Sequence, residues 1–568
     1  MPVITKICRP TKLCIKCSIV INFKQMKKII IVLTTLLLGQ NTFSCTNIIV
    51  TKGASKDGSA FLFYTCDGEF LYHLKKYPAK DYKKGEFYYF KNYKGEITGK
   101  IPQVKHTYAT IGSHINEFQV AIGETTFTGR EELINHSAFI NYWNLMHLAL
   151  ERAKTAKEAV NVITSIVDNY GYASSGETFS IVDKNEAWLL EMIGTGDGGK
   201  GAVWVAVKVP DGMVTAHANK ARIGEFPLND PENCLYSKNV ISFAVEKGYY
   251  NPKSGKPFKF NDVYCPATPA KLRYCSSRVW SIFNRVSPSL HLSMDYNRGV
   301  VGAKEYPLYI KPDKKIGIKD MFNLVRDHYE GTSIDMTKGF DAGPFGNPNR
   351  LRPLNWSVDS VECAWERPIS ISNASFSFIA QLRNFMPDNI GGVLWFSDDD
   401  TYTSCYLPIY NSVSDVPKPY KTGDFNNFSW SSAWWTFNFV SNYANIRYSD
   451  MIKDIQAVQD SIESDFIKNQ KIIEEKALNL EKQNKNNEVT ALLTNYDNSK
   501  ADMLMKRWKE LGYFLITKYN DGYVKDKNGY PHQTGYPEEY KRAALKNRPS
   551  VILPDWNQSK EDNKATDF

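Results

Sequence analysis

Histidine is scarce in this chain of 568 residues, and the motifs that mark many hydrolases and nucleotide-binding proteins are missing. There are 9 histidines and no G-x-S-x-G, H-E-x-x-H or G-x-x-x-x-G-K-[ST]. These absences argue against a serine nucleophile elbow, a zinc-protease helix and a P-loop. A formal G-x-G-x-x-G at 194–199 joins two strand-like segments and opens no helix. A hairpin loop explains it better than a dinucleotide site.

A strong excess of charge of one sign is also missing. The chain has 70 Lys and Arg against 61 Asp and Glu, a net charge of +9, and no basic run dense enough to form a nucleic-acid stripe. We therefore expect no nucleic-acid partner. The 42% apolar and 13% aromatic content is typical of a globular protein.

The N-terminal region contains the one hydrophobic run that needs an explanation. From Met26 it reads MKKIIIVLTTLLLGQNTFS: a short basic start, an apolar stretch at 29–38, and small residues Thr42 and Ser44 before a cysteine. This pattern is typical of a secretory signal peptide, and the stretch is short for a membrane span. We expect residues 1–44 to be the signal, with Met26 as the true start. The mature protein would be extracytoplasmic, periplasmic or secreted, with no stable membrane insertion.

Cysteines are few and irregularly spaced once this signal is removed. They form neither a disulfide scaffold nor a zinc site, and no ligand cluster suggests a metal or another cofactor. Cys265 and Cys275 are a candidate disulfide pair. The seven cysteines after the signal are Cys45, Cys66, Cys234, Cys265, Cys275, Cys363 and Cys405.

The order of the expected elements indicates an α+β protein. Strands come first, then two helices within 137–171 that end at Gly171, then strands again. Turn signals predict three hairpins in this half, around Asp57-Gly58, at 183–186 and at 210–212.

The second half mixes loops with strands and ends in helices. Paired strands are expected within 375–410, and a charged helical region from about 450 to 515 shows apolar residues at helical spacing. We expect a catalytic domain over 45–440 and a helical region over 441–568 that packs on it and ends in a polar tail. Coiled-coil binding to a partner is the alternative for these helices.

Cys45 is the residue with the most distinctive chemistry. At a new N-terminus it would carry a thiol of pKa about 8.5 and an α-amine of pKa about 7.7–8.0. The amine can accept the thiol proton, so one residue supplies both nucleophile and general base. Two other interpretations stay open here. One is a lipid anchor, although Thr42 and Ser44 do not match a lipobox, and the other is a plain structural cysteine.

The stretch CTNIIVTKGASKDGSAFLFYTCDGE resembles the start of the PepD-like dipeptidases, which are cysteine-type N-terminal-nucleophile (Ntn) hydrolases. The matching features are Cys45-Thr46, the turn at 54–59 and Asp67. Later segments such as YGYASSGETFSIVDKNEAWLLEMIG and QLRNFMPDNIGGVLWFSDDD are similar to the family as well. The resemblance implies a four-layer αββα sandwich with Cys45 at the head of a core strand, extended by C-terminal helices. It also implies hydrolysis of dipeptides through a thioester.

The resemblance suggests roles for several further residues. Asn116 and Asn219 are the candidates for stabilising the oxyanion, and Asp67 would orient the α-amine or hold the substrate ammonium. Arg222 would bind a carboxylate, and Glu124 is a weaker candidate for binding substrate. A further carboxylate, Glu191, fits a structural ion pair better.

One position departs from the family pattern. Many members carry an arginine three residues before the strand aspartate, where this chain has Tyr64. Either another residue supplies the cation or Tyr64 acts as a hydrogen-bond donor near the substrate.

Two other functions remain as alternatives to a dipeptidase acting on a small peptide. A choloylglycine- or penicillin-type amide acylase would share the Cys-Thr start but use an apolar acyl pocket. A lipid-anchored surface binding protein would use the Trp- and Tyr-rich segments. The sequence leaves open whether the protein forms a homo-oligomer.

Overall fold

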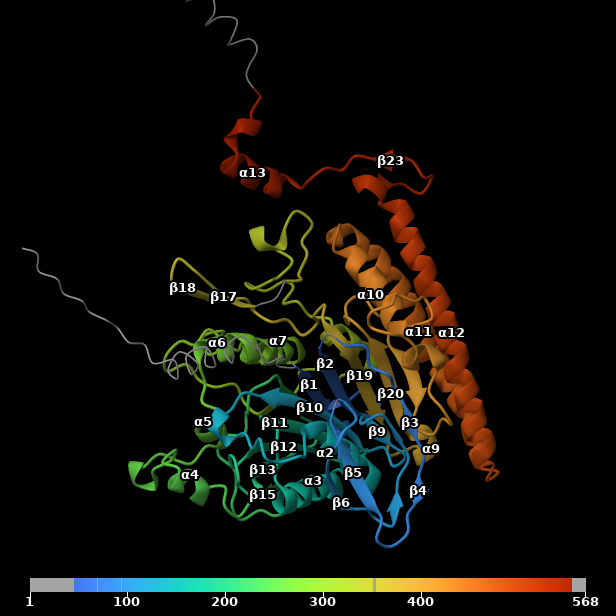
Figure 1. Cartoon of the computed structure of the whole chain (residues 1–568). Helices are drawn as coiled ribbons and strands as arrows, with labels where there is room; N and C mark the ends of the chain where they lie inside the picture. The colour runs from blue at the N-terminus through green and yellow to red at the C-terminus, as the bar shows by residue number, and fades with distance from the viewer. Residues whose placement is uncertain (1–44, 69, 93, 351–353, 554–568) are drawn as a thin grey trace, which may run out of the picture. The chain divides into compact units, whose positions relative to one another are not determined.

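The computed structural model describes residues 45–68, 70–92, 94–350 and 354–553. The expected signal peptide, 1–44, and the end of the polar tail, 554–568, lie outside the described residues. The described chain is a mixed α/β protein with two large antiparallel sheets. In Figure 1 the strands β1 and β2 lie at the centre, with helices on either side of the two sheets.

The first sheet contains the segment that begins directly after Cys45. Its central strands read TNIIV and AFLFYTCD and are buried along their whole length, which is typical of strands covered on both faces. Its seven strands, in spatial order, are β16 (Tyr309–Ile310), β14 (Val214–His217), β1 (Thr46–Val50), β2 (Ala60–Asp67), β19 (Ala374–Leu382), β20 (Val393–Asp398) and β21 (Leu407–Tyr410).

The second sheet is built mainly from the hairpins that the sequence predicts between 176 and 209. The loop at 194–199 joins two paired strands, as expected, and opens no helix. The eight strands, in spatial order, are β15 (Cys234–Tyr236), β13 (Ala202–Val209), β12 (Ala187–Gly194), β11 (Gly176–Val182), β10 (Ala121–Phe127), β9 (Ile115–Asn116), β8 (Thr110–Ile111) and β3 (Lys76–Tyr77).

The two sheets face each other at β1 and β2 of the first and β10 and β11 of the second. Gly123 of β10 permits the close approach. A Cβ added there would lie 2.9 Å from the Cβ of Tyr64 and 3.1 Å from Nδ2 of Asn47. A larger residue at this position would push the sheets apart where Cys45 lies.

The hairpin predicted at 210–212 is wrong. β13 belongs to the eight-stranded sheet and β14 to the seven-stranded sheet, so this turn carries the chain from one sheet to the other. The turn is held by the loop after β1, because Gly53 N donates to Asp211 Oδ1 at 2.7 Å and Thr51 N to Met213 O at 3.1 Å. Local turn signals do not reveal which sheet the next strand will join.

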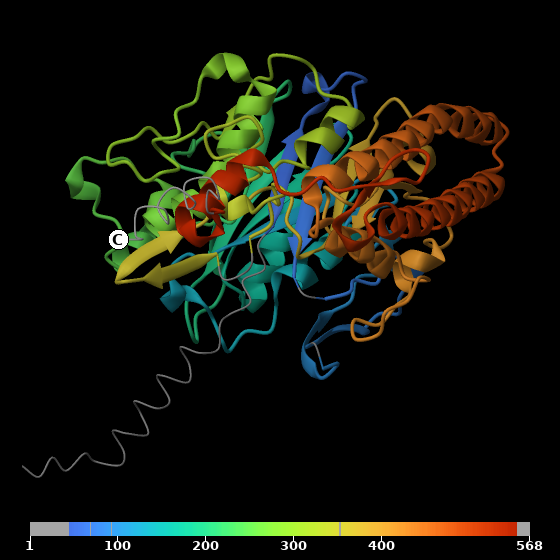
Figure 2. The same cartoon turned by 90° about the horizontal axis from the view of Figure 1, so that it is seen from above.

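Helices contact both sheets. α2 (Tyr142–Arg152) and α3 (Ala156–Tyr170) contact the eight-stranded sheet, and α3 ends at Gly171 with a positive φ of 82°, as expected. α10 (Ala433–Ala444), α11 (Tyr448–Glu481) and α12 (Asn486–Lys518) contact the other sheet or its edge. Figure 2 shows α11 and α12 as a long helical hairpin.

Shorter elements complete the described chain. The remaining helices are α4 (Ser242–Glu246), α5 (Phe260–Tyr264), α6 (Pro269–Lys271), α7 (Ser277–Val286), α8 (Ile318–Leu324), α9 (Asp388–Gly391) and α13 (Glu538–Asn547). Four two-stranded sheets pair β4 (Lys80–Asp81) with β7 (His106–Thr107), β5 (Phe87–Lys91) with β6 (Ile97–Pro102), β17 (Asn355–Val358) with β18 (Val361–Ala364), and β22 (Val524–Lys525) with β23 (Pro531–His532).

Buried ion pairs fix α11 against the first sheet. Glu463 is fully buried and pairs with Arg326, and Glu474 contacts Arg383 at 2.7 Å. Tyr410 of β21 also donates its hydroxyl to Glu474 at 3.0 Å. These contacts make α11 part of the packed body around the sheet.

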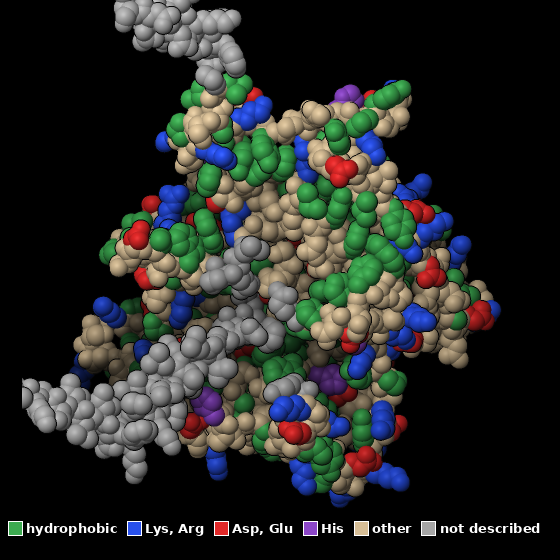
Figure 3. All heavy atoms as spheres, turned by 45° about the horizontal axis from the view of Figure 1, so that its top comes forward, with side chains coloured by type: hydrophobic (Ala, Val, Ile, Leu, Met, Phe, Trp, Pro, Cys, Tyr) green, Lys and Arg blue, Asp and Glu red, His purple; other side chains and the backbone are tan. Residues whose placement is uncertain are grey.

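The outer surface carries charges of both signs. On the face shown in Figure 3, Lys and Arg are interspersed with Asp and Glu. None of the described helices combines the length and the apolar character that crossing a membrane would require.

The Arg326–Glu463 pair generates a stability prediction. Arg326→Ala removes the buried guanidinium that pairs with Glu463 and leaves it with the partly exposed Lys319, 3.5 Å away. We therefore expect the free energy of unfolding to fall by about 3–5 kcal/mol. Denaturant unfolding measures this change. Lys453→Ala, which removes an exposed partner 4.0 Å from Asp450, is the control and should change stability by less than about 1 kcal/mol. An equally small effect of Arg326→Ala would contradict the prediction.

Candidate active site

Cys45 lies directly before β1, at the point where the two sheets meet, and its side chain is fully buried. Its thiol donates to Oε1 of Glu124 at 3.1 Å and lies 3.9 Å from the hydroxyl of Tyr64. The pairing of Thr46 with Thr65 places Cys45 next to Cys66 on β2. The structure thus brings together three of the site residues that the sequence indicates: Cys45, Tyr64 and Glu124.

Tyr64 and Glu124 connect the sheets at this point. Tyr64 comes from β2, Glu124 comes from β10, and the Tyr64 hydroxyl donates to Oε1 of Glu124 at 2.6 Å. Of the two alternatives for the missing family arginine, the structure therefore shows Tyr64 as a hydrogen-bond donor. The Tyr64 hydroxyl and the Cys45 thiol both donate to the same carboxylate, that of Glu124.

Two buried arginines hold the start of β1. Arg278 of α7 donates to Cys45 O at 2.7 Å and to Thr46 Oγ1 at 2.8 Å. Arg367, from the segment before β19, donates to the same hydroxyl at 2.9 Å. Both side chains are fully buried. The structure therefore also supplies cations near Cys45, from other parts of the chain.

Asp67 balances part of this positive charge. Its carboxylate forms an ion pair with Arg367, and both groups are buried. Burial, together with the neighbouring Arg367, lowers the pKa of Arg278 to about 10. Arg278 therefore remains charged at neutral pH. Arg367 links Asp67 to Thr46, because it pairs with the Asp67 carboxylate and donates to the Thr46 hydroxyl.

The surroundings of Cys45 favour the protonated form of its thiol. Burial raises its pKa well above the usual value, and Cys66 and the charge of Glu124 act in the same direction. Burial also raises the pKa of the Tyr64 hydroxyl. A protonated thiol needs a nearby base before it can act as a nucleophile.

Asn219 lies beside this site. The β1–β14 register pairs Asn47 with His217, so Asn219 is two positions further along toward Cys45. Its Oδ1 accepts from Arg278 at 2.9 Å and its Nδ2 donates to Thr126 O at 2.8 Å. Within the described chain the amide has no second acceptor, which leaves one N–H for a ligand.

Asn116 is placed differently. Its amide donates both hydrogens to main-chain carbonyls after and within α2, to Leu150 O at 2.9 Å and to Ala153 O at 2.8 Å. Its Oδ1 accepts from two main-chain N–H groups of its own loop. The side chain is fully used in holding this loop against the end of α2, and no N–H remains for an oxyanion.

Arg222 is also occupied by the main chain. Its guanidinium donates to Ala216 O, Leu308 O and Pro307 O, and the side chain is buried. Its main-chain N–H donates to Glu191 Oε1 at 2.5 Å. This arrangement fits a residue that joins segments of the fold, and it leaves Glu191 as a buried acceptor of main-chain N–H groups.

The candidate disulfide is wrong. Cys265 and Cys275 are both free thiols, and their sulfurs donate to different carbonyls, Thr128 O at 3.7 Å and Asn219 O at 3.3 Å. Spacing in the sequence does not fix the distance between two sulfurs in the fold.

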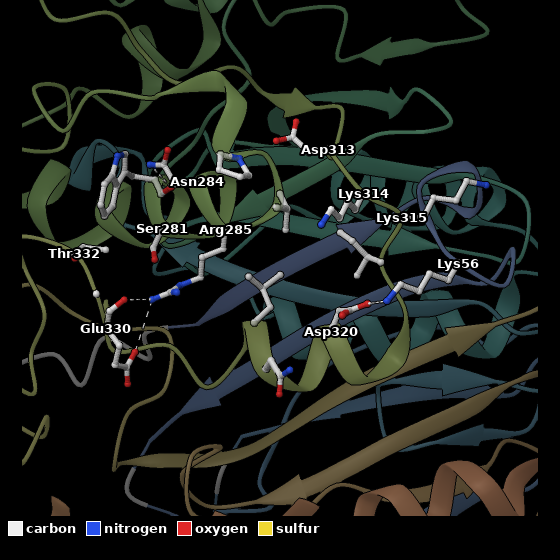
Figure 4. Close-up of a pocket in the computed structure, with 17 residues that line it drawn as sticks. Lys56, Ser281, Asn284, Arg285, Asp313, Lys314, Lys315, Asp320, Glu330 and Thr332 are labelled. Atoms are coloured by element: carbon white, nitrogen blue, oxygen red, sulfur yellow. Dashed lines mark hydrogen bonds and ion pairs between the residues drawn. The ribbon is translucent and has the colours of Figure 1, made fainter.

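A separate pocket of about 730 Å³ opens between α7, α8 and the loops beside them. Figure 4 shows Arg285 next to Glu330 in one part of it and Lys56 next to Asp320 in another. Its lining residues do not include Cys45, Tyr64 or Glu124.

Arg278 and Arg367 are the residues that sequence reasoning missed. They lie more than 230 and 320 residues beyond Cys45 along the chain. Arg278 stands in the helix-like segment SRVWSIFNRV, where charged residues usually face solvent. No local signal distinguishes it from a surface arginine.

Comparisons with known proteins agree with the peptidase interpretation. The profile of Peptidase family C69 matches residues 75–461, most of the chain. This chain therefore belongs to peptidase family C69 and is a peptide hydrolase.

The chain is similar to several curated relatives. It is 26% identical over 419 residues to a "Probable dipeptidase" of Salmonella dublin, covering 70% of this chain and 87% of that protein. It is 25% identical over 443 residues to a "Probable dipeptidase B" of Streptococcus pyogenes serotype M1, covering 74% and 82%.

One solved structure with a detectable likeness is penicillin V acylase from Agrobacterium tumefaciens. It is 11% identical, covers 64% of this chain and 86% of that chain, and superposes with a TM-score of 0.27. That score is too low to support an argument about the fold.

The contacts of Arg278 generate a prediction. Arg278→Lys cannot bond the Cys45 carbonyl and Oδ1 of Asn219 together, because Arg278 reaches them through two different nitrogens, Nη1 and Nη2, and a lysine has only one nitrogen in its side chain. We expect kcat for peptide hydrolysis to fall about 10- to 100-fold with KM little changed, since a small misplacement of a reacting group has effects of this size.

The matched control is Arg285→Lys on the same helix. Arg285 pairs with Asp327 and Glu330 and does not contact β1. Its replacement should leave kcat within about threefold. Equal losses for the two variants would mean that Arg278 matters only for folding.

Proposed function

We propose that the mature protein is an extracytoplasmic dipeptidase that begins at Cys45 and uses its thiol as the nucleophile. The observation that carries the proposal is the position of this thiol. It stands next to the expected cleavage site, at the junction of two sheets, and its own carbonyl is held by the buried Arg278. Such fixation suits a reacting group and is more than a packing cysteine needs.

The proposed reaction follows from the groups at this point. Cleavage after Ser44 would free the α-amine of Cys45, which takes the thiol proton. The sulfur then attacks the carbonyl carbon of the dipeptide, and the second N–H of Asn219 donates to the resulting oxyanion. The C–N bond breaks, the leaving amine takes the proton from the α-ammonium, and a thioester remains on Cys45. Water, deprotonated by the α-amine, hydrolyses the thioester and regenerates the thiol.

We infer an αββα Ntn-hydrolase sandwich with a C-terminal helical extension over 441–568. The contacts of α2 and α3 with one sheet, of α10 and α12 with the other, and of the sheets with each other support it.

A dipeptide suits the site better than the apolar acyl group of an acylase. The curated relatives are named as dipeptidases, and the buried carboxylate of Glu124 lies 3.1 Å from the thiol. A carboxylate beside an apolar acyl chain would be desolvated without compensation. A lipid on Cys45 would block both the amine and the thiol.

The first prediction from this proposal concerns the nucleophile. Cys45→Ser should be exported and processed normally, but kcat for a dipeptide such as Ala-Ala should fall by at least about 1000-fold. Cys234→Ser changes another buried free thiol, on β15 at the edge of the eight-stranded sheet, and serves as the control. Activity retained in Cys45→Ser would rule out the mechanism.

The second prediction concerns the α-amine. One extra residue left before Cys45 moves the amine away from the sulfur, so hydrolysis should fall at least about 100-fold. The intact mass of the exported protein shows where its N-terminus lies. A lipid adduct on Cys45, or full activity of the extended form, would contradict the proposed base.

A further inference from the structure

Two buried carboxylates lie together, and one of them, Glu124, accepts from the Cys45 thiol at 3.1 Å. Glu124 of β10 and Glu177 of β11 are both fully buried. They are on the same face of the sheet, because Thr126, two residues after Glu124, pairs with Glu177. The Thr126 hydroxyl lies 3.0 Å from Oε2 of Glu177 and 3.5 Å from Oε2 of Glu124.

Among the described residues, no Lys, Arg or His side chain forms an ion pair with Glu124 or Glu177. Oε1 of Glu177 and the buried hydroxyl of Tyr172 also have no hydrogen-bond partner there. Burial and the charge of Glu124 raise the pKa of Glu177. Burial and the charge of Glu177 likewise raise the pKa of Tyr172, which places its hydroxyl near the pair. Unpaired buried carboxylates are costly, and a positively charged ligand would relieve that cost.

The ligand is better identified as an ammonium group than as a metal ion. The described residues contain no group of three or more His, Cys, Asp or Glu side chains that could hold a metal. An alkylammonium brings three N–H donors and one positive charge, and the site offers carboxylate and hydroxyl oxygens as acceptors.

The distances match the α-ammonium of a dipeptide. In such a substrate the nitrogen is two bonds, roughly 2.5 Å, from the scissile carbonyl carbon. That carbon must come within about 3–3.5 Å of the sulfur for attack. Oε1 of Glu124 is 3.1 Å from the Cys45 sulfur. A substrate in position to react can therefore place its ammonium within hydrogen-bonding reach of Glu124.

We propose that Glu124, with Glu177 beside it, binds the free α-ammonium of the substrate and restricts the enzyme to dipeptides with an unblocked N-terminus. This inference rests on the proposed function and names its substrate class. Tyr64 has a part in it, because a neutral hydroxyl donates to Glu124 and leaves the negative charge uncompensated. A cationic side chain at this position would compete with the substrate ammonium.

The binding also has a consequence for the nucleophile. The charge of Glu124 contributes to the raised pKa of the Cys45 thiol. An ammonium bound to Glu124 offsets that charge and favours the thiolate. Binding of the substrate thereby makes the Cys45 thiolate easier to form.

The test compares two substrates of the same shape on protein that begins at Cys45. Ala-Ala carries the ammonium, and isobutyryl-alanine has a methyl group in its place. The measured quantity is the ratio of kcat/KM for the two substrates. We expect the unaltered enzyme to prefer Ala-Ala, and Glu124→Gln to lower the ratio at least about 100-fold, because a buried charge-assisted contact is lost.

Two further variants make the result interpretable. Glu124→Asp keeps the charge and should retain part of the preference, and it replaces Glu124→Gln as the test should the latter fail to fold. Glu186→Gln makes the same chemical change at the partner of Lys208, away from Cys45, and should keep both the ratio and the activity.

The outcomes separate this inference from the proposed function. A ratio unchanged in Glu124→Gln would overturn the ammonium site while dipeptide hydrolysis stands. Equal losses on both substrates would overturn it too, because Glu124 would then serve the enzyme's own amine or thiol. Absence of Ala-Ala hydrolysis by protein with a free Cys45 would overturn the proposed function and, with it, the ammonium site.

Discussion

The arrangement of this site depends on holding Cys45, the residue directly before β1, in place. A chain terminus is usually among the most mobile parts of a protein, yet the reaction proposed here needs a terminal thiol and amine fixed to within a fraction of an ångström. Arg278 and Arg367 meet this need, because they donate to the carbonyl of Cys45 and to the hydroxyl of Thr46. The guanidinium groups are themselves fixed by burial and, for Arg367, by Asp67.

Near Cys45 the two faces of the first sheet make different kinds of contact. Thr46 is held by the arginines, whereas Cys45, its neighbour, contacts Glu124 of the opposite sheet. Alternate side chains of a strand point to opposite faces, so one residue can be anchored while the next reacts. Gly123 makes this possible by letting β10 approach β1 and β2.

Charge in the site is unevenly compensated. The positive groups are matched by Asp67 and by neutral acceptors, but Glu124 and Glu177 form no ion pair with any described Lys, Arg or His. The contacts that they make are with hydroxyl groups and, for Glu124, the Cys45 thiol. A protein interior tolerates such an imbalance poorly. The imbalance is what separates, in the proposed function, a peptide with a free ammonium from an amide with an apolar acyl group.

The sequence alone determined the class of chemistry and much of the local structure. The resemblance to a dipeptidase family predicted a peptide hydrolase, and Cys45 after an expected export signal was the predicted nucleophile. Hydrophobic periodicity and turn residues located most strands of the two large sheets and both helices before Gly171. These signals are local, so they can be recognised in the sequence without knowledge of the fold. They could not tell that β13 and β14 join different sheets, or that Asn116 spends both amide hydrogens on main-chain carbonyls.

Only the tertiary structure decided which distant side chains reach Cys45. Arg278 and Arg367 look like ordinary arginines in the sequence, and Glu177 like an ordinary strand residue. Each matters because folding brings it into a buried site from far along the chain, and burial turns a weak surface charge into a strong one. Arg222 differs from these residues. The sequence suggested that it binds a substrate carboxylate, but in the fold its guanidinium donates to main-chain carbonyls and joins segments of the chain.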